Sequence, residues 1–254
     1  MNFENKVCLI TGASSGIGAA AAEYLSKLGA SVALVGRNET NLKKVCEKCT
    51  IPNQAKPLAI VADVNKDSSK IIELTINTFG RIDVLINNAG IGVPSNIFTN
   101  QLTDYDNIMT TNVRSVYQLT TLAVPHLIES KGNIVNVSSL AGIRSYPNAL
   151  IYCMSKAALD QFTKCVSLEL APKGVRVNSV NPAVIRTEFH ENNGVKAEDL
   201  EQFLEQCKKD HALGRIGEVD EVAYAIAFLA SEQASFMTGV LLPVDGGKAN
   251  MCPR

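Results

Sequence analysis

Short apolar runs alternate with longer stretches of helical spacing along the whole chain. Residues 7–10 form the first apolar run, apolar side chains then recur at helical spacing from 17 to 28, and Gly29 ends that stretch as glycine often ends a helix. The predicted strands are 7–10, 32–35, 58–61, 84–86, 133–137, 175–180 and 240–244. The predicted helices are 17–28, 40–49, 67–79, 104–129, 151–170 and 219–229.

The predicted strands are apolar on both faces. Strands of this kind occur in parallel sheets that helices cover from both sides. Because strands and helices alternate, the pattern predicts an α/β fold class. We expect a Rossmann-type doubly wound sheet of about seven parallel strands with helices on both faces, formed by a single domain over residues 1–254.

One segment breaks the alternation. Residues 186–209 are charged and helix-leaning at a point where the strand at 175–180 should lead directly into the next helix. Long insertions in compact domains often serve as lids, and we take residues 186–212 as a candidate substrate lid. A surface excursion without a role explains the segment nearly as well. His190 lies in this segment and is a candidate for contact with substrate.

Composition narrows the class of protein. Of the 254 residues, 46% are apolar and 19% are charged, which excludes a disordered chain. A net charge of -1 offers no electrostatic surface to nucleic acid, and no apolar run approaches the roughly 20 residues of a membrane helix. Seven cysteines do not make a disulfide scaffold at this length, and the polar start leaves no room for a signal peptide. We therefore expect a cytoplasmic protein without nucleic-acid or membrane partners.

A glycine-rich turn follows the first predicted strand and opens the first predicted helix. Glycines allow a tight turn and let a pyrophosphate approach the amide groups, and the helix N-terminus adds partial positive charge. The glycine spacing differs from the common G-x-G-x-x-G fingerprint, but the position between strand and helix predicts a nucleotide site. Its candidate residues are Gly12, Ser14, Ser15, Gly16, Ile17 and Gly18.

The end of the second predicted strand indicates which dinucleotide binds. An acid usually stands there to hold the ribose 2′-hydroxyl, but this chain has Gly36, Arg37 and Asn38. The forked guanidinium of Arg37 suits a 2′-phosphate, so NADP is favoured over NAD, with Arg37 and Asn38 as contacts. Two alternatives stay open: Arg37 as an ordinary surface arginine, and Glu39 folding back as the ribose acid.

Polar side chains also follow the later strands. Asn87-Asn88-Ala89-Gly90 follows the fourth predicted strand, and Ser138-Ser139 follows the fifth. Tyr152 and Lys156 lie four residues apart and therefore share one face of the next helix. All of these residues fall at the carboxyl ends of strands or just beyond, where open α/β sheets bind their ligands.

Over nearly its whole length, the sequence resembles the short-chain dehydrogenases/reductases. The resemblance is to NADP-preferring members that consist of a single domain. Ser139 stands 13 residues before Tyr152, which is the family spacing and selects it over Ser138. The motifs that carry the resemblance are Thr11-Gly12-x-x-x-Gly16-x-Gly18, Asp63-Val64, Asn87-Asn88-Ala89-Gly90, Asn112, Ser139, Tyr152-x-x-x-Lys156, Asn181-Pro182 and Asp245-Gly246-Gly247.

The resemblance implies a catalytic set of Asn112, Ser139, Tyr152 and Lys156. Tyr152 would give its proton to a carbonyl oxygen as hydride arrives; a free tyrosine has a pKa of about 10, and Lys156 beside it would favour the phenolate. Lys156 would also hold the nicotinamide ribose. Ser139 would hydrogen-bond the substrate oxygen, and Asn112 would hold a water that links Lys156 to solvent.

The resemblance also extends the cofactor site. Asp63 would meet the adenine amino group with Val64 beside the ring, and Ile185 and Thr187 would hold the carboxamide. This chain has Pro182-Ala183 where the family usually has Pro-Gly, a difference that bears on the local turn and the cofactor's fit there. The other implied contacts are Asn88, Ala89, Gly90, Tyr152 and Lys156, together with Pro182 and Ala183.

Three regions are positioned to shape a substrate pocket: residues 92–95, residues 140–146 and the candidate lid. Their apolar members suggest an apolar carbonyl or alcohol substrate, although ordinary packing explains some of them equally well. These members are Val93, Leu140, Ile143, Tyr146 and Phe189. The Cys46-x-x-Cys49 pair has no second pair at zinc spacing and lies inside a predicted helix, so we expect no metal site.

Together these interpretations predict an NADP(H)-dependent oxidoreductase that interconverts a ketone or aldehyde and an alcohol by hydride transfer, with Tyr152 as acid and base. Two alternatives are a 3-oxoacyl-thioester reductase and a nucleotide-binding sensor or scaffold with little activity. The intact catalytic set argues against the scaffold, since a silent protein has no chemical need for all four residues.

Two predicted helices carry few charged residues, and this pattern predicts that subunits associate. Between residues 113 and 128 the formal charge is that of Arg114, and between 157 and 168 the charges are those of Asp160 and Lys164. A helix at the surface of a monomer should have a broader polar face. We expect a homotetramer, with a dimer as the alternative, as the resemblance also implies. The competing explanation is that residues 186–209 fold over these helices.

Overall fold

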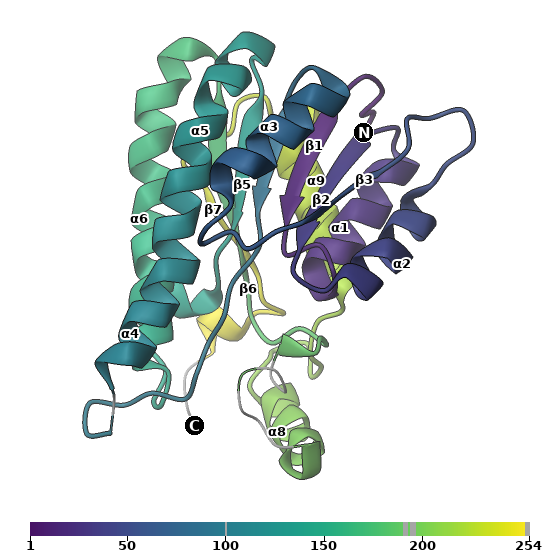
Figure 1. Cartoon of the computed structure of the whole chain (residues 1–254). Helices are drawn as coiled ribbons and strands as arrows, with labels where there is room; N and C mark the ends of the chain where they lie inside the picture. Colours follow the sequence, from purple (N-terminus) through teal and green to yellow (C-terminus); the bar gives the residue numbers. More distant parts are fainter. Residues whose placement is uncertain (100, 190–192, 194–196, 252–254) are drawn as a thin grey trace.

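A sheet of seven parallel strands forms the middle of the molecule (Figure 1). The computed structural model describes residues 1–99, 101–189, 193 and 197–251. The strands are β1 (Val7–Thr11), β2 (Ser31–Gly36), β3 (Leu58–Val61), β4 (Val84–Asn87), β5 (Asn133–Val137), β6 (Arg176–Pro182) and β7 (Leu241–Val244). Their order in the sheet is β3-β2-β1-β4-β5-β6-β7. The predicted strands and their parallel arrangement are confirmed, with small differences at the strand ends.

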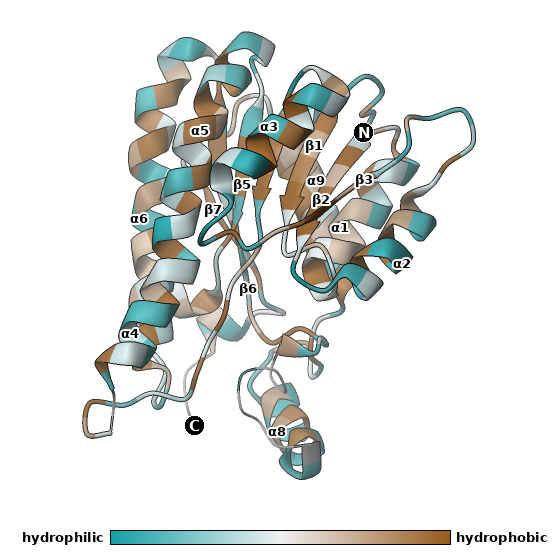
Figure 2. Cartoon of the chain, in the orientation of Figure 1, coloured by the Kyte–Doolittle hydropathy of each residue, from teal (hydrophilic) through white to brown (hydrophobic). Residues whose placement is uncertain are grey.

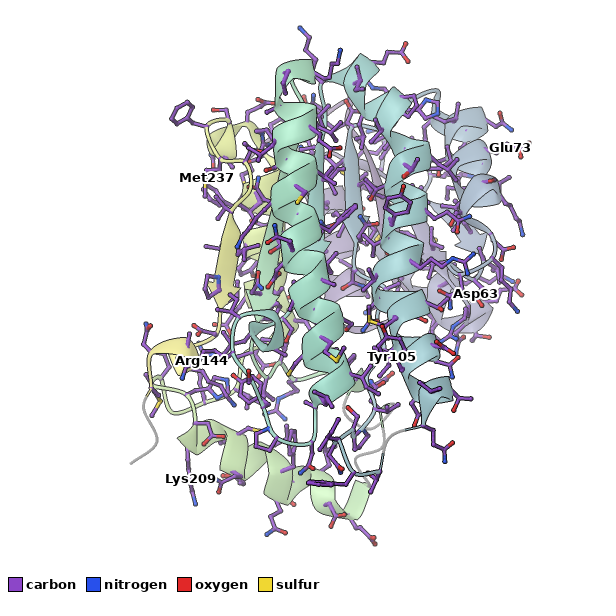
Figure 3. The ribbon with its side chains drawn as sticks, turned by 90° about the vertical axis from the view of Figure 1, so that its left-hand side faces the viewer. Asp63, Glu73, Tyr105, Arg144, Lys209 and Met237 are labelled. Atoms are coloured by element: carbon purple, nitrogen blue, oxygen red, sulfur yellow. The ribbon has the colours of Figure 1, made fainter. Side chains whose placement is uncertain are left out.

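Helices cover both faces of the sheet, as the sequence predicts. One face carries α1 (Gly16–Lys27), α2 (Glu39–Cys49) and α9 (Val219–Ala230). The other carries α3 (Ser68–Phe79), α5 (Ser115–Ser130) and α6 (Leu150–Leu170). Figure 2 shows the apolar strands enclosed between these two layers, and Figure 3 shows α5 and α6 lying side by side along the outside.

Strand β1 shows why the strands are apolar at consecutive positions. Successive side chains of a strand point to opposite faces of the sheet. Cys8 and Ile10 therefore enter the core beneath α1 and α9, whereas Leu9 enters the core beneath α3 and α5. All three are fully buried, because each face of the sheet has its own layer of helices.

The strand order reverses between β1 and β4. Strand β2 continues the sheet on one side of β1, and β4 continues it on the other. At such a switch point the connections leave in opposite directions and open a crevice at the carboxyl ends of the strands. The glycine-rich turn after β1 lies at this crevice, and Gly12 and Gly16 have left-handed backbone with φ of +64° and +57°. A residue with a side chain is strained in that conformation.

The helix predicted over residues 104–129 is interrupted. The structure has α4 (Leu102–Met109), then a π-helical turn η1 (Thr110–Arg114), and then α5. Asn112 lies within η1, where its side chain bonds the backbone of Ile91 in both directions. A π-helical turn adds one residue to a helix and is frequent at functional sites. Periodicity alone does not reveal such a turn, because the apolar pattern continues on both sides of it.

The segment that breaks the alternation contains α8 (Ala197–Lys209), which lies beyond the carboxyl edge of the sheet (Figure 1). The described residues of this segment do not lie along α5 and α6, in contrast to the competing explanation that the segment covers these helices (Figure 1). His190 lies outside the described residues. Short 3₁₀ turns complete the chain: η2 (Leu140–Gly142), η3 (Ala171–Lys173), η4 (Glu232–Ala234) and η5 (Lys248–Asn250). Across the described ranges, each helix is too short or too polar to cross a membrane.

Candidate active site

The glycine-rich loop packs directly on the segment that follows β4. A Cβ at Gly12 would lie 2.8 Å from the Asn88 side chain and 2.9 Å from the Ala89 Cα atom, and a Cβ at Gly18 would overlap the Gly12 carbonyl oxygen. Asn88 Nδ2 donates to the Gly12 carbonyl at 3.1 Å, and the amides of Asn88 and Ala89 donate to the Thr11 hydroxyl. These glycines are therefore required by packing, and Asn88 braces the loop.

The N-terminus of α1 is open to an anion. Ser15 is the N-cap residue, but its side chain makes no capping hydrogen bond. The amides of a first helical turn carry partial positive charge and favour phosphate. Ser14 lies against Gly36 at the end of β2, and a Cβ at Gly16 would lie 3.3 Å from Thr187. The residues present fit the pyrophosphate of a dinucleotide.

The structure at the end of β2 distinguishes between Arg37 and Glu39, the two candidates for binding the adenosine ribose. Glu39 forms an ion pair with Lys43 at 2.7 Å, so its carboxylate is engaged on the surface of α2. Arg37 is exposed and has no acidic partner among the residues that the structure describes. Asn38 caps α2 by accepting a hydrogen bond from the amide of Asn41 at 3.0 Å. The guanidinium of Arg37 is the free charge at this end.

The turn after β3 carries an unsatisfied acceptor. Asp63 and Val64 are partly buried there, and Asp63 Oδ1 accepts a hydrogen bond from the Asn65 amide. Asn65 Nδ2 donates to Thr111, whereas Asn65 Oδ1 is buried and has no partner within the described ranges. Buried acceptors are normally satisfied, so this oxygen fits a donor on a bound molecule, such as an amino group.

Ser139, Tyr152 and Lys156 converge at the carboxyl end of β5. Ser139 begins the η2 turn, where its hydroxyl accepts from the Ala141 amide at 3.1 Å and hydrogen-bonds Tyr152. Lys156 is buried, and its Nζ atom lies 5.6 Å from the centroid of the Tyr152 ring. A Cβ at Gly90 would lie 3.6 Å from that nitrogen. The reaction end therefore adjoins the β4 segment that packs on the glycine-rich loop.

Burial opposes charge on both groups. It raises the pKa of Tyr152 to about 12, and the hydrogen bond from Ser139 offsets only part of this rise. It lowers the pKa of Lys156 to about 8, against the attraction of Asp160. That Lys156 favours the phenolate stays a prediction. The ammonium donates to the Val137 carbonyl at 2.9 Å and lies 5.6 Å from the centroid of the tyrosine ring.

Asn112 lies close to Lys156, since a Cβ at Gly90 would be 3.3 Å from Asn112 Oδ1 and 3.6 Å from Lys156 Nζ. Its Oδ1 accepts from the Ile91 amide at 2.9 Å, and its Nδ2 donates to the Ile91 carbonyl at 2.8 Å and to the Ser155 hydroxyl at 3.0 Å. Asn112 thus ties the segment after β4 to α6. Its predicted part in holding a water stays a prediction.

The residues predicted to line a substrate pocket separate into two groups. The Phe189 ring lies 5.8 Å from the Tyr152 ring, and a Cβ at Gly92 would lie within 3.4 Å of both rings. Val93, next to Gly92, is partly buried. Asn193, which no sequence motif singles out, accepts from the Gly92 amide at 2.6 Å and donates to the Phe189 carbonyl.

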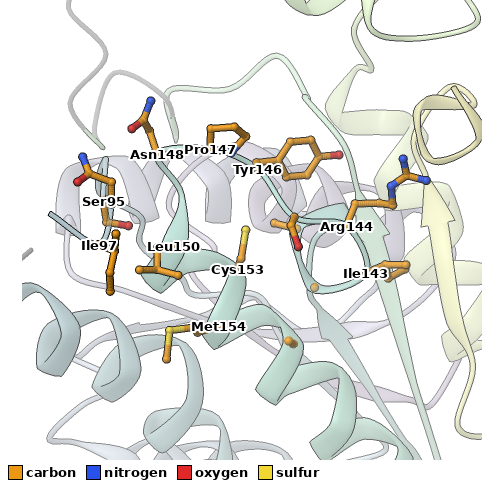
Figure 4. Close-up of a pocket in the computed structure, with 15 residues that line it drawn as sticks. Ser95, Ile97, Ile143, Arg144, Tyr146, Pro147, Asn148, Leu150, Cys153 and Met154 are labelled. Atoms are coloured by element: carbon orange, nitrogen blue, oxygen red, sulfur yellow. The ribbon is translucent and has the colours of Figure 1, made fainter. Parts of the chain in front are cut away.

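The second group does not lie beside Tyr152. Leu140 is buried at 1% exposure and belongs to the interior. Ile143 and Tyr146 line a hollow of about 500 Å³ on the far side of the loop, together with Cys153 and Met154 (Figure 4). This hollow contains neither Ser139 nor Tyr152. Sequence spacing predicts that these residues lie near the carboxyl edge of the sheet but does not indicate the direction in which each side chain points.

The chain continues from β6 along the cofactor side. Ala183 is accommodated without strain, because the non-glycine residues with left-handed backbone in the described chain are Asn5, Asn53, Lys131 and Asn148. Its amide donates to the Val244 carbonyl at 3.2 Å, so the turn is paired to β7. Other residues predicted to contact the cofactor also form hydrogen bonds or packing contacts within the protein. Pro182 accepts from Ser139, Ile185 is buried, Thr187 accepts from the Phe189 amide, and Ile17 packs on the core.

The cysteine pair behaves as ordinary helix residues. Cys46 and Cys49 are free thiols, and burial raises the pKa of both, that of Cys49 to about 11. A raised pKa disfavours the thiolate that metal binding and redox exchange require. Within the part of the chain that the structure describes, no three His, Cys, Asp or Glu side chains gather as a metal site.

Comparisons with known proteins agree with this geometry. The sequence model of a family described as "Enoyl-(Acyl carrier protein) reductase" matches residues 12–249. The L-xylulose reductase of Caenorhabditis elegans is 38% identical over 251 residues, which cover 98% of this chain and 98% of that protein.

Two solved structures are also closely similar. A short-chain dehydrogenase/reductase of unknown function from Caenorhabditis elegans, determined with cofactor, gives a TM-score of 0.93 at 33% identity and covers 98% of this chain and 97% of that one. A 3-ketoacyl-(acyl-carrier-protein) reductase from Brucella melitensis, complexed with NADH, gives a TM-score of 0.89 at 35% identity, with coverage of 98% and 100%. The chain belongs to the short-chain dehydrogenase/reductase family of oxidoreductases.

Proposed function

We propose that the protein is an NADP(H)-dependent oxidoreductase that interconverts a ketone or aldehyde and an alcohol, with Tyr152 as the acid and base. The observation that carries this proposal is the convergence of Ser139, Tyr152 and Lys156 beside the segment that packs on the glycine-rich loop. A bound nicotinamide would supply the hydride. The protein contributes position, hydrogen bonds and a proton.

Each residue of this set has a distinct task. The Ser139 hydroxyl holds the substrate oxygen next to Tyr152. The Tyr152 hydroxyl donates its proton to that oxygen as negative charge develops on it. The Lys156 ammonium, which is buried and beside Gly90, holds the ribose hydroxyls and stabilises negative charge on the phenol oxygen. Asn112 keeps the segment after β4 in register with α6.

The pKa of Tyr152 determines which form of its hydroxyl group is present at neutral pH. Burial raises the pKa of Tyr152 to about 12, so the phenol holds its proton throughout the neutral range. A protonated phenol is ready to act as an acid, whereas alcohol oxidation needs the phenolate. The phenol is therefore protonated and able to act as an acid at neutral pH, while the direction of the net reaction follows from the ratios of cofactor and substrate.

NADP is the proposed cofactor, with NAD as the alternative. Arg37 directly follows β2 and has an exposed guanidinium. The nearby acid Glu39 forms an ion pair with Lys43. A guanidinium matches the 2′-phosphate of NADP in charge and in geometry. Asp63, with the unsatisfied Asn65 oxygen beside it, is the proposed contact for the adenine amino group.

A turnover screen tests the proposal. NADPH oxidation, followed by absorbance, should accelerate when apolar ketones or aldehydes are added. NADH should support less activity at equal concentration. A scaffold would bind NADPH but oxidise it no faster with any carbonyl present. The panel should include 3-oxoacyl thioesters, because the similarity to the Brucella melitensis reductase favours them as a second candidate substrate class.

The substrate is proposed to be apolar and to enter beneath the candidate lid. Phe189 and Val93 present apolar surface next to Tyr152. The lid would span residues 186–212 of a single domain covering 1–254. The six cysteines that the structure describes are all free thiols, which suits a reducing compartment, so the cytoplasm is the proposed location.

We also propose that the subunits assemble as a homotetramer, with a dimer as the alternative. The outer surface of α5 and α6 exposes 62% of Tyr117, 46% of Met154 and 75% of Leu168. Apolar exposure of this kind on two adjacent helices is typical of an interface between subunits. Light scattering at micromolar concentration tests it, and a mass near the monomer's 27.3 kDa would contradict it.

A further inference from the structure

A buried carboxylate lies one helical turn beyond Lys156. Asp160 is on α6 and is only 4% exposed. A buried carboxylate is costly unless hydrogen bonds compensate for its lost hydration. The motifs that carry the family resemblance do not include an acid at this position. The presence of a buried acid here therefore needs an explanation. Its partners identify that role.

Both carboxylate oxygens of Asp160 accept from one donor on the sheet. Asn181 Nδ2, on β6, lies 3.0 Å from Oδ1 and 3.0 Å from Oδ2. The same nitrogen donates its other hydrogen to the Ser139 carbonyl at 3.0 Å. Asn181 is completely buried, and its own oxygen accepts from Ser179 at 2.6 Å. The orientation of the Asn181 amide is thereby fixed from both ends.

The η2 turn rests on the same carboxylate. A side chain at Gly142, the last residue of η2, would overlap Asp160 Oδ2. The Gly142 amide donates to the Ser139 carbonyl at 3.0 Å. The Ser139 carbonyl therefore has two donors, one from η2 and one from Asn181, and Asp160 contacts both of them. The backbone of Ser139 determines where its hydroxyl points.

Ser138 adds a second connection. Its hydroxyl hydrogen-bonds Asp160 and also lies 3.3 Å from the Lys156 carbonyl oxygen. Asp160 thus joins the end of β5, the end of β6 and the helix that carries Tyr152. A hydrogen-bonded network of this kind holds its members in one geometry when all of its donors and acceptors are satisfied.

We propose that Asp160 is a positioning residue that holds Ser139 in its reactive orientation through Asn181. The proposal rests on the proposed function, since Ser139 has a task only if a carbonyl or alcohol is bound. An amide at position 160 would set a donor against the Asn181 or Ser138 donor, because both carboxylate oxygens act as acceptors. The network would then open at Ser139, while Arg37 and the glycine-rich loop would be untouched.

The test compares two isosteric changes at buried carboxylates. Asp160→Asn alters the network, whereas Asp83→Asn alters a carboxylate at the other end of the strands. Asp83 is 1% exposed and bonds the Val7 amide at 2.9 Å and the Arg81 side chain. Both changes should lower the melting temperature. The expected signature of Asp160→Asn is a kcat about tenfold lower, the scale of a small misplacement of a reacting group, with an unchanged Kd for NADPH.

Two further readouts separate positioning from general loosening. Backbone amides between residues 139 and 143 should exchange with solvent about tenfold faster in Asp160→Asn and at the wild-type rate in Asp83→Asn. The alkaline limb of the pH profile should move to lower pH, because Asp160 raises the pKa of Lys156. The charges acting on Asp160 are those of Lys156 and Lys164 on α6, whereas β6 and the end of β5 present the neutral groups of Asn181 and Ser138. The tenfold comparison of kcat is therefore made on the acid plateau.

The outcomes are decisive in each case. Wild-type kcat and exchange in Asp160→Asn, or an equal loss of kcat in Asp83→Asn, would overturn the proposal. If Asp160→Asn does not fold, Ser138→Ala removes one donor to the carboxylate and should give the same signature at about threefold. If the wild-type protein reduces no carbonyl, the proposed function fails, but the exchange of residues 139–143 still decides whether Asp160 positions this turn.

Discussion

The two ends of the site are built in different ways. At the cofactor end, the shape comes from backbone: Gly12 and Gly18 are present because a Cβ would meet neighbouring backbone, and α1 offers its amides without a side-chain cap. At the reaction end, the shape comes from buried polar side chains, since Lys156 and Asp160 are each 4% exposed.

This difference determines how each end responds to substitution. A backbone site tolerates changes at exposed positions around it and selects its ligand through a few charges at the rim. A site of buried side chains depends on hydrogen bonds between distant parts of the chain, so the loss of one group leaves others unsatisfied. Variants at the two ends should therefore separate turnover from cofactor affinity.

The largest effect should follow from breaking the reaction end alone. Tyr152→Phe removes the proposed proton donor but keeps the ring that lies 5.8 Å from the Phe189 ring. Turnover should fall by about 10²-fold or more, the usual scale for a positioned acid. The Kd for NADPH, measured by fluorescence titration, should stay near the wild-type value. Wild-type turnover in this variant would show that the proton comes from another group.

A substitution of Arg37 should affect the cofactor end alone. Arg37→Ala removes an exposed charge that has no acidic partner in the described chain. A charge-assisted hydrogen bond contributes about 1.5–3 kcal/mol, so NADPH should bind roughly 10- to 100-fold more weakly. NADH affinity and kcat at saturating cofactor should change little. Equal losses for NADPH and NADH would mean that Arg37 supports the structure instead of reading the 2′-phosphate.

A change of pH sharpens the comparison without any substitution. Lys156 has its pKa lowered to about 8 by burial, and Tyr152 has its pKa raised to about 12. As pH rises through about 8, the ammonium loses its proton while the phenol keeps its own. The rate of carbonyl reduction should then fall by about tenfold per pH unit above the lysine pKa. A rate that stays flat to pH 10 would show that Lys156 does not act as a cation.

The sequence predicts position well where a motif is local along the chain. The glycine-rich loop and the Tyr152–Lys156 pair are each contained in a few residues, and the structure brings both to the carboxyl edge of the sheet. The strands were equally predictable because both faces of the sheet are apolar. Each of these signals is carried by residue type and spacing alone.

The remainder depended on neighbours that are distant in sequence. Asp160 lies four residues after Lys156, and that spacing was visible, but its meaning depends on Asn181, which reaches it from β6. The raised pKa of Tyr152 follows from three-dimensional burial, which no spacing encodes. Ile143 and Tyr146 fell in the expected loop but face a different hollow. Chemical type was thus predictable, whereas orientation was not.

The smallest expected effect concerns the position where this chain departs from its family. Ala183 has backbone that any residue adopts, and its amide bonds Val244 at 3.2 Å. Ala183→Gly should therefore lower the free energy of unfolding by about 0.4–1 kcal/mol, because glycine gives the unfolded chain more freedom. The Kd for NADPH should stay within about twofold of the wild-type value, well under 1.4 kcal/mol. If glycine instead tightened NADPH binding by about tenfold, the alanine methyl would obstruct the cofactor, and this part of the cofactor end would depend on side chains as the reaction end does.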